Sequence, residues 1–230
     1  MRINLVALSV ALSGLLLSSA IAFAAEPSAT RQILNGRVEL HNESAVARNN
    51  SHVDAYGTST VRAEDQAKVR AFGSSHVSAY GNSEVTAAAK TTVEAYAQSH
   101  VSVDGYAQVT ACDNSHVDAD GDSTITASGH AHVLARGNAV VTATDQATVF
   151  ARDNVKVLAS GNAKVIALDN ANVIASGNAI VDAHSNTEVT ARGSAWVKAV
   201  KTVKLNKESD KVKLTILKKE PAAVSPNITM

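Results

Sequence analysis

Residues 163–178 read AKVIALDN-ANVIASGN, two consecutive copies of an eight-residue unit whose pattern runs through most of the chain. The first, third and fifth places of the unit hold small or apolar residues, whereas the second, fourth and sixth places vary. This alternation is typical of a β-strand with one buried face, and Val at the third place suits a pleated surface. The seventh and eighth places hold Gly-Asn, Asp-Asn or similar pairs, which turn the chain. Each unit therefore predicts one short strand followed by one tight corner.

The unit recurs about twenty times between residues 43 and 202, without a clear insertion. Because a strand with a single apolar face buries it only by stacking on its neighbours, a short period of this length predicts an all-β chain folded as a parallel β-solenoid. Two units per coil, about 16 residues, would give a flattened two-sheet β-roll that Val, Ala and Ser fill at native density. A three-sided coil is the alternative, since closely similar units begin at Ser51 and Ser75.

The ends of the chain depart from the repeat. Arg2 and an apolar run over residues 5–17 precede Ala22-Phe23-Ala24, a small-x-small cleavage pattern, which predicts a signal peptide and export to the periplasm, cell surface or medium. The apolar run is too short to predict a membrane span, so no transmembrane segment is expected in the mature chain. We expect five segments: a signal peptide (1–24), an N-terminal cap (25–42), the repeat (43–202), a capping β-hairpin (203–220) and a loose tail (221–230).

Composition and motifs argue against two classes of function. The 21 Lys and Arg residues balance the 21 Asp and Glu residues, which argues against a general nucleic-acid binder. The sequence has no Gly-rich phosphate loop between a strand and a helix, and no nucleophile elbow. Its acidic residues and histidines follow the repeat register, so we expect a protein that is not an enzyme and needs no cofactor.

The outward fourth place changes from polar to apolar along the chain. Early units carry residues such as Asp54 and Arg62, whereas later units carry apolar side chains. In a two-unit coil these side chains form ladders on the two sheets, and such outward apolar ladders commonly bind a partner. We therefore expect self-association or a cell-surface partner, unless the C-terminal segment folds back over a ladder. The ladder residues are Leu134, Phe150 and Ile166 on one sheet, and Leu158 and Ile174 on the other.

Two further outward columns suggest alternative functions. His100, His116 and His132 occupy the second place at intervals of sixteen residues, and Asp118 lies two residues beyond His116. Stacked imidazoles and a carboxylate predict a divalent transition-metal site, although repeated copying of one unit would produce the same column. The fourth-place threonines give a short column that would suit ice binding; they are Thr110, Thr126 and Thr142.

The segment Val133-Leu134-Ala135-Arg136-Gly137-Asn138 shows the Val-x-Ala core and Gly-Asn corner in their clearest form. This pattern resembles the short-repeat parallel β-rolls of bacterial surface proteins, such as the heads of trimeric autotransporter adhesins, and the ice-binding β-rolls of grasses. The resemblance implies a β-solenoid with an adhesive or ice-binding surface. Our leading expectation is an exported, non-enzymatic β-solenoid that acts as a structural, adhesive or self-associating module.

Overall fold

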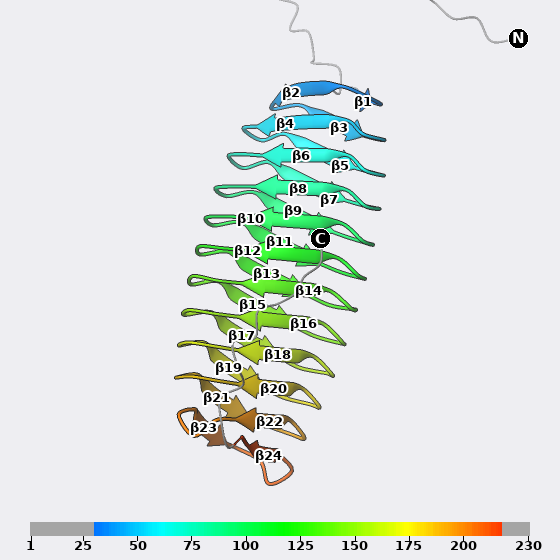
Figure 1. Cartoon of the computed structure of the whole chain (residues 1–230). Coiled ribbons are helices and arrows are strands. Elements are labelled where there is room, and N and C mark those ends of the chain that lie inside the picture. Colours follow the sequence, from blue (N-terminus) through cyan, green and yellow to red (C-terminus); the bar gives the residue numbers. More distant parts are fainter. Residues whose placement is uncertain (1–29, 218–230) are drawn as a thin grey trace, which may run out of the picture.

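The computed structural model describes residues 30–217 as a roll of two parallel sheets with 12 strands each (Figure 1). Sheet A contains the odd-numbered strands: β1 (Arg31–Ile33), β3 (Ser44–Ala47), β5 (Thr60–Ala63), β7 (His76–Ala79), β9 (Thr92–Ala95), β11 (Gln108–Ala111), β13 (Thr124–Ala127), β15 (Val140–Ala143), β17 (Lys156–Ala159), β19 (Asn172–Ala175), β21 (Glu188–Ala191) and β23 (Lys204–Lys207). Sheet B contains the even-numbered strands: β2 (Arg37–His41), β4 (His52–Tyr56), β6 (Lys68–Ala71), β8 (Glu84–Ala87), β10 (His100–Val103), β12 (His116–Ala119), β14 (His132–Ala135), β16 (Thr148–Ala151), β18 (Lys164–Ala167), β20 (Ile180–Ala183), β22 (Trp196–Ala199) and β24 (Lys213–Ile216).

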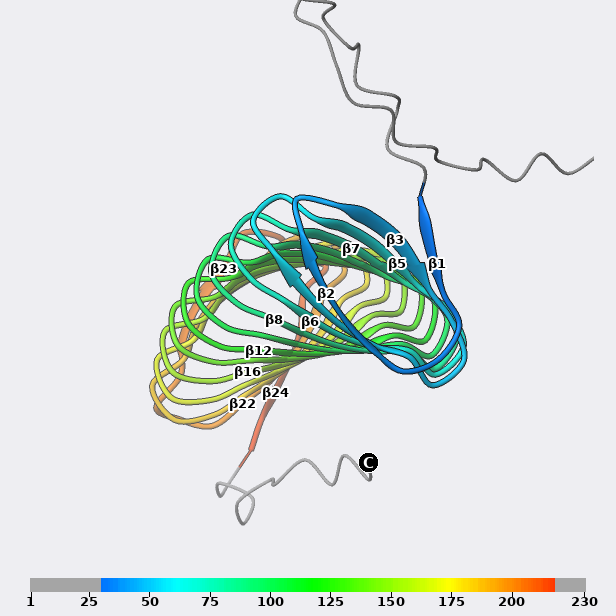
Figure 2. The same cartoon turned by 90° about the horizontal axis from the view of Figure 1, so that it is seen from above.

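The strand register confirms the two-sheet coil of sixteen residues and excludes the three-sided alternative. Each repeat strand pairs in parallel with the strand one coil later, so that His100 lies opposite His116. Equal places of the repeat therefore form columns along the roll, about 4.8 Å apart from coil to coil. Figure 2 shows that successive coils rotate about the roll axis, as the natural twist of β-sheets requires.

The core is a thin seam between the two sheets. The third-place valines and fifth-place alanines of the repeat are buried; for example, Val165 is 1% exposed and Ala167 is fully buried. From Ser51 to Ala195 the first place is also buried, and there the side chain is Ser, Thr, Ala or Val. Only small side chains fit between two sheets that lie so close together, which explains the near absence of large apolar residues from the repeat interior.

The corners depend on the seventh place, where the backbone adopts positive φ at every corner from Asn49 to Gly193. Gly accepts this conformation without a steric cost, and Asp tolerates it better than most residues. An Asp at this place also accepts a hydrogen bond from the seventh-place N–H one coil earlier: Asp153 Oδ2 lies 3.0 Å from Gly137 N, and Asp145 Oδ2 lies 3.2 Å from Gly129 N. These carboxylates satisfy backbone donors that the sheet ladders leave unpaired.

The two ends correct part of the predicted organisation. β1 and β2 form a first coil, and β2 pairs with β4 one residue out of the regular period, with Arg37 opposite His52. The predicted C-terminal hairpin is wrong, because β23 and β24 lie in opposite sheets and continue the solenoid as parallel strands. With no later coil among the described residues to cover them, the inward Leu214 and Ile216 are 45% and 52% exposed. The predicted signal peptide and tail lie outside the described residues.

Candidate functional site

The apolar column of sheet B is assembled as predicted, but its central ring does not face solvent. Leu134 pairs with Phe150, and Phe150 pairs with Ile166 on the next strand. Phe150 is only 6% exposed, and the guanidinium carbon of Arg152 lies 5.1 Å from its ring centroid. Because large neighbours on both adjacent strands and an Arg side chain cover the ring, the expectation that Phe150 offers a free binding surface is wrong.

The apolar residues of sheet A are more accessible. Leu158 pairs with Ile174 and is 47% exposed. Val140 is 42% exposed and lies diagonally from Leu158, since its direct partner is Lys156, two residues before Leu158. We call Val140, Leu158 and Ile174 the sheet A apolar face. Three apolar side chains that share one outer face are the type of surface that a partner covers.

The three histidines of the predicted column stack along the roll, but their imidazoles do not surround a common centre. His100, His116 and His132 pair in succession, and the rings of His116 and His132 stack with centroids 5.1 Å apart at 16°. Burial, reinforced by His132 and His100, lowers the pKa of His116. The Asp118 carboxylate lies 3.2 Å from the Arg136 guanidinium. Within residues 30–217, no three His, Cys, Asp or Glu side chains are grouped to hold a metal ion.

The threonine column is also present and short. Thr110 pairs with Thr126 and Thr126 with Thr142, but the next residue in the column is Leu158. Ice binding through this column stays a prediction.

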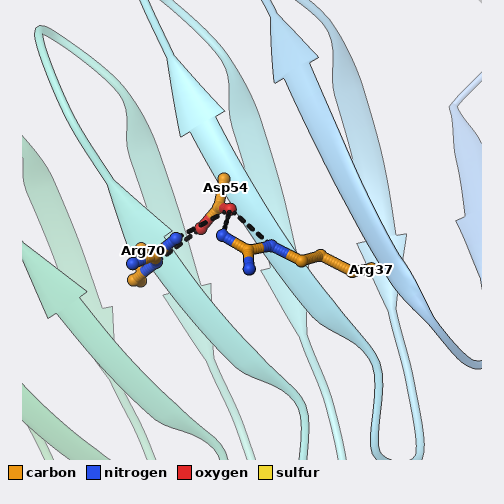
Figure 3. A network of polar contacts seen from close by, with 3 residues as sticks. All are labelled: Arg37, Asp54 and Arg70. Carbon is orange, nitrogen blue, oxygen red and sulfur yellow. Dashed lines mark hydrogen bonds and ion pairs between the residues drawn. The ribbon is translucent and has the colours of Figure 1, made fainter.

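Sequence reasoning missed an ion-pair network near the N-terminal end of sheet B (Figure 3). Asp54 is 3% exposed, and its carboxylate lies 2.6 Å from Arg37 Nη2 and 2.6 Å from Arg70 Nε. Arg70 lies opposite Asp54 in the next strand, so this contact follows from the sixteen-residue spacing. Arg37 comes from a second place in the irregular first coil and reaches Asp54 diagonally, which the repeat pattern does not reveal.

The network makes the stability of the first coils sensitive to acid. The hydrogen bond from Arg70, together with Arg37 and against the effect of burial, lowers the pKa of Asp54 to about 2. The Asp54 carboxylate therefore stabilises the folded chain fully at pH values above the pKa of Asp in the unfolded chain, about 3.9. This stabilisation is lost as the pH falls towards 2.

We expect Asp54→Asn to reduce the free energy of unfolding by about 2 kcal/mol at pH 7, and to make little difference near pH 2. Urea unfolding followed by circular dichroism at pH 7, 4 and 2 measures this. Asp104→Asn, which removes an exposed carboxylate from the corner that follows β10, is the control. A constant difference between Asp54→Asn and the parent at all three pH values would contradict the role assigned to the carboxylate.

No family model, curated protein or solved structure matches this chain. None of the elements formed by residues 30–217 is a helix with the length and apolarity needed to cross a membrane. Functional inference therefore rests on the surfaces of the roll itself.

Proposed function

We propose that this protein is an exported, non-enzymatic β-solenoid that acts as a structural or adhesive module and self-associates through the sheet A apolar face. The observation that carries the proposal is the exposure of Leu158 and Val140 beside Ile174 on a regular sheet surface. The signal-peptide pattern of residues 1–24 supports export. The likeness of the repeat to the β-rolls of bacterial surface proteins supports an adhesive role.

The geometry of sheet A favours a second copy of the chain as the partner. The side chains of the face project from the same side of three adjacent strands that are in register, so they form one continuous surface. Two such faces can meet with little rearrangement, since the strands that carry them are fixed by ladder hydrogen bonds on both sides. Burying Leu158 and Val140 against apolar atoms contributes about 25 cal/mol for each Å² removed from water.

The test compares the wild type with Leu158→Ser/Ile174→Ser by sedimentation velocity over a range of protein concentrations. We expect the wild type to form dimers or larger species, and the variant to sediment as a monomer. The control is Leu134→Ser/Ile166→Ser, which makes matched changes on sheet B and should leave the association unchanged. A wild type that stays monomeric, or a Leu158→Ser/Ile174→Ser variant that associates like the wild type, would overturn the proposal.

A further inference from the structure

One edge of the roll carries an almost unbroken column of carboxamide side chains. These residues occupy the eighth place of the units that lead from sheet A into sheet B, one per coil, and all of them are exposed. A single coil interrupts the column, where His130 stands in the same place. We call this set the amide column: Asn50, Gln66, Asn82, Gln98, Asn114, Gln146, Asn162 and Asn178.

The backbone does not require amides at these positions. The left-handed conformation of each corner falls on the preceding residue, such as Asp65 or Gly81, and no member of the amide column has positive φ. Gln, which alternates with Asn in the first half of the column, has no special place in turns. The opposite edge shows that other residues serve equally well at the eighth place, because its early corners carry Thr58, Ser74, Lys90, Tyr106 and Asp122.

Most of these amides also lack a structural role within the chain. Asn178 Nδ2 donates to Asn162 Oδ1 over 3.4 Å, which makes one step of an amide ladder. Within the described part of the chain, the side-chain amides of Gln66, Asn82 and Gln98 make no hydrogen bond. Each therefore presents two N–H donors and one carbonyl acceptor to whatever lies outside the roll.

The amide column forms one wall of a strip of surface along the edge of sheet B that is hollowed at two places, and we call this strip the groove. The second-place side chains of sheet B form the other wall. Two open depressions lie along this groove, of about 450 Å³ near the N-terminal end and about 500 Å³ in the C-terminal half. Gln66 and Asn82 line the first, whereas Gln146 and Asn162 line the second. His100 and His116 occupy the second-place wall between the two depressions.

The charges in the groove nearly cancel. In the first depression, Lys68 Nζ lies 2.7 Å from a carboxylate oxygen of Glu84. The second depression contains Lys164 as its one Lys, Arg, Asp or Glu residue, among amides, imidazoles, a threonine and Ile180. A groove of this composition offers many neutral donors and acceptors and little net charge, so it does not suit a polyanion such as nucleic acid.

We propose that this groove binds an extended, uncharged, β-linked polysaccharide. Sugar hydroxyls donate and accept hydrogen bonds, and a carboxamide matches both functions with one side chain. The amides repeat at about 4.8 Å along an edge that turns gradually with the twist of the roll (Figure 2). This spacing is close to the length of one sugar unit in an extended β-linked chain, so such a chain can follow the column with about one sugar for each amide. Because the roll is rigid, the amides are already in position before the ligand binds. This preorganisation reduces the conformational entropy that is lost on binding.

Polysaccharide binding rests on the adhesive role proposed above and names the partner. It uses the groove, whereas self-association uses the sheet A apolar face. The sheet A apolar face lies on the sheet opposite the second-place wall of the groove. Leu158→Ser/Ile174→Ser should therefore abolish self-association while retaining glycan binding. The two proposals can fail independently.

Calorimetry of the purified protein with cellohexaose and chitohexaose tests the inference. Isomaltohexaose, which is flexible and α-linked, and polygalacturonate, which is acidic, are the comparison ligands. We expect at least one β-linked hexasaccharide to bind, and Gln66→Ala/Asn82→Ala/Gln98→Ala to weaken that binding at least tenfold. Asn154→Ala/Asn170→Ala/Asn186→Ala removes as many amides from the opposite edge and should leave affinity within about twofold. Circular dichroism establishes that both variants remain folded.

Several outcomes would overturn the inference. The first is that the wild type binds neither β-linked hexasaccharide, and the second is that the two triple variants lose affinity to the same extent. The third is that isomaltohexaose binds as tightly as the β-linked hexasaccharides, and the fourth is that polygalacturonate is the only ligand bound. The last outcome would assign the groove to an acidic polymer instead.

Discussion

Val165→Asp is expected to destabilise the centre of the roll by about 3–5 kcal/mol, because it places an unpaired charge in a dry interior. Val165 is 1% exposed and pairs with Val149 on one side and Val181 on the other. Each coil contacts chiefly its immediate neighbours, so the damage should centre on β18 and spread to β16 and β20. Hydrogen exchange should show the loss of protection in these strands before the terminal coils respond.

The matched control is Lys164→Asp, one residue earlier in the same strand. Lys164 is exposed, and the same new side chain there should change the free energy of unfolding by no more than about 0.5 kcal/mol. Urea unfolding of both variants gives the comparison. Similar losses in the two variants would contradict the inward and outward assignment on which every column in the roll depends.

The repeat specified the fold well because each unit determines its own local structure. Alternation decides which face of each strand is buried, as for Val165 and Lys164, and the corner residues decide where each strand ends. Once coil length is known, all column neighbours follow. The prediction of a hairpin failed for residues 203–217 because the corners there lose the Gly-Asn pattern, although the alternation of inward and outward residues continues. Leu205 and Leu214 then stack on Val189 and Val197, since the open edges of sheets A and B offer ladder hydrogen bonds that a hairpin would leave unused.

The candidate sites were less predictable because they depend on how long side chains reach across the surface, which the repeat spacing does not determine. The sixteen-residue spacing correctly placed Phe150 between Leu134 and Ile166. It did not reveal that the Arg152 side chain covers the Phe150 ring. Arg37 reaches Asp54 only because the first coil is irregular. The amide column was available in the sequence, but corners from both edges share one consensus. It becomes visible only when alternate units are assigned to separate edges.

Gly137→Ala tests the close stacking of corners and should cost about 3 kcal/mol. Gly137 has a φ of +69°, where an alanine loses about 1 kcal/mol. An added Cβ would also lie 2.9 Å from the carbonyl oxygen of Gly121 in the preceding coil, and backbone cannot move aside cheaply. Any shift would also disturb the hydrogen bond that Gly137 N donates to Asp153.

Gly105→Ala, on the same edge two coils earlier, separates the backbone cost from the clash. Its φ is +79°, but its nearest atom would be Ala89 N at 3.4 Å, an ordinary contact. Ala89 itself has a φ of +64°, so this edge already accommodates an alanine in that conformation. Gly105→Ala should therefore lose only about 1 kcal/mol. Chemical denaturation of both variants measures the difference, and equal losses would show that coil-to-coil contact at the corner is looser than the structure places it.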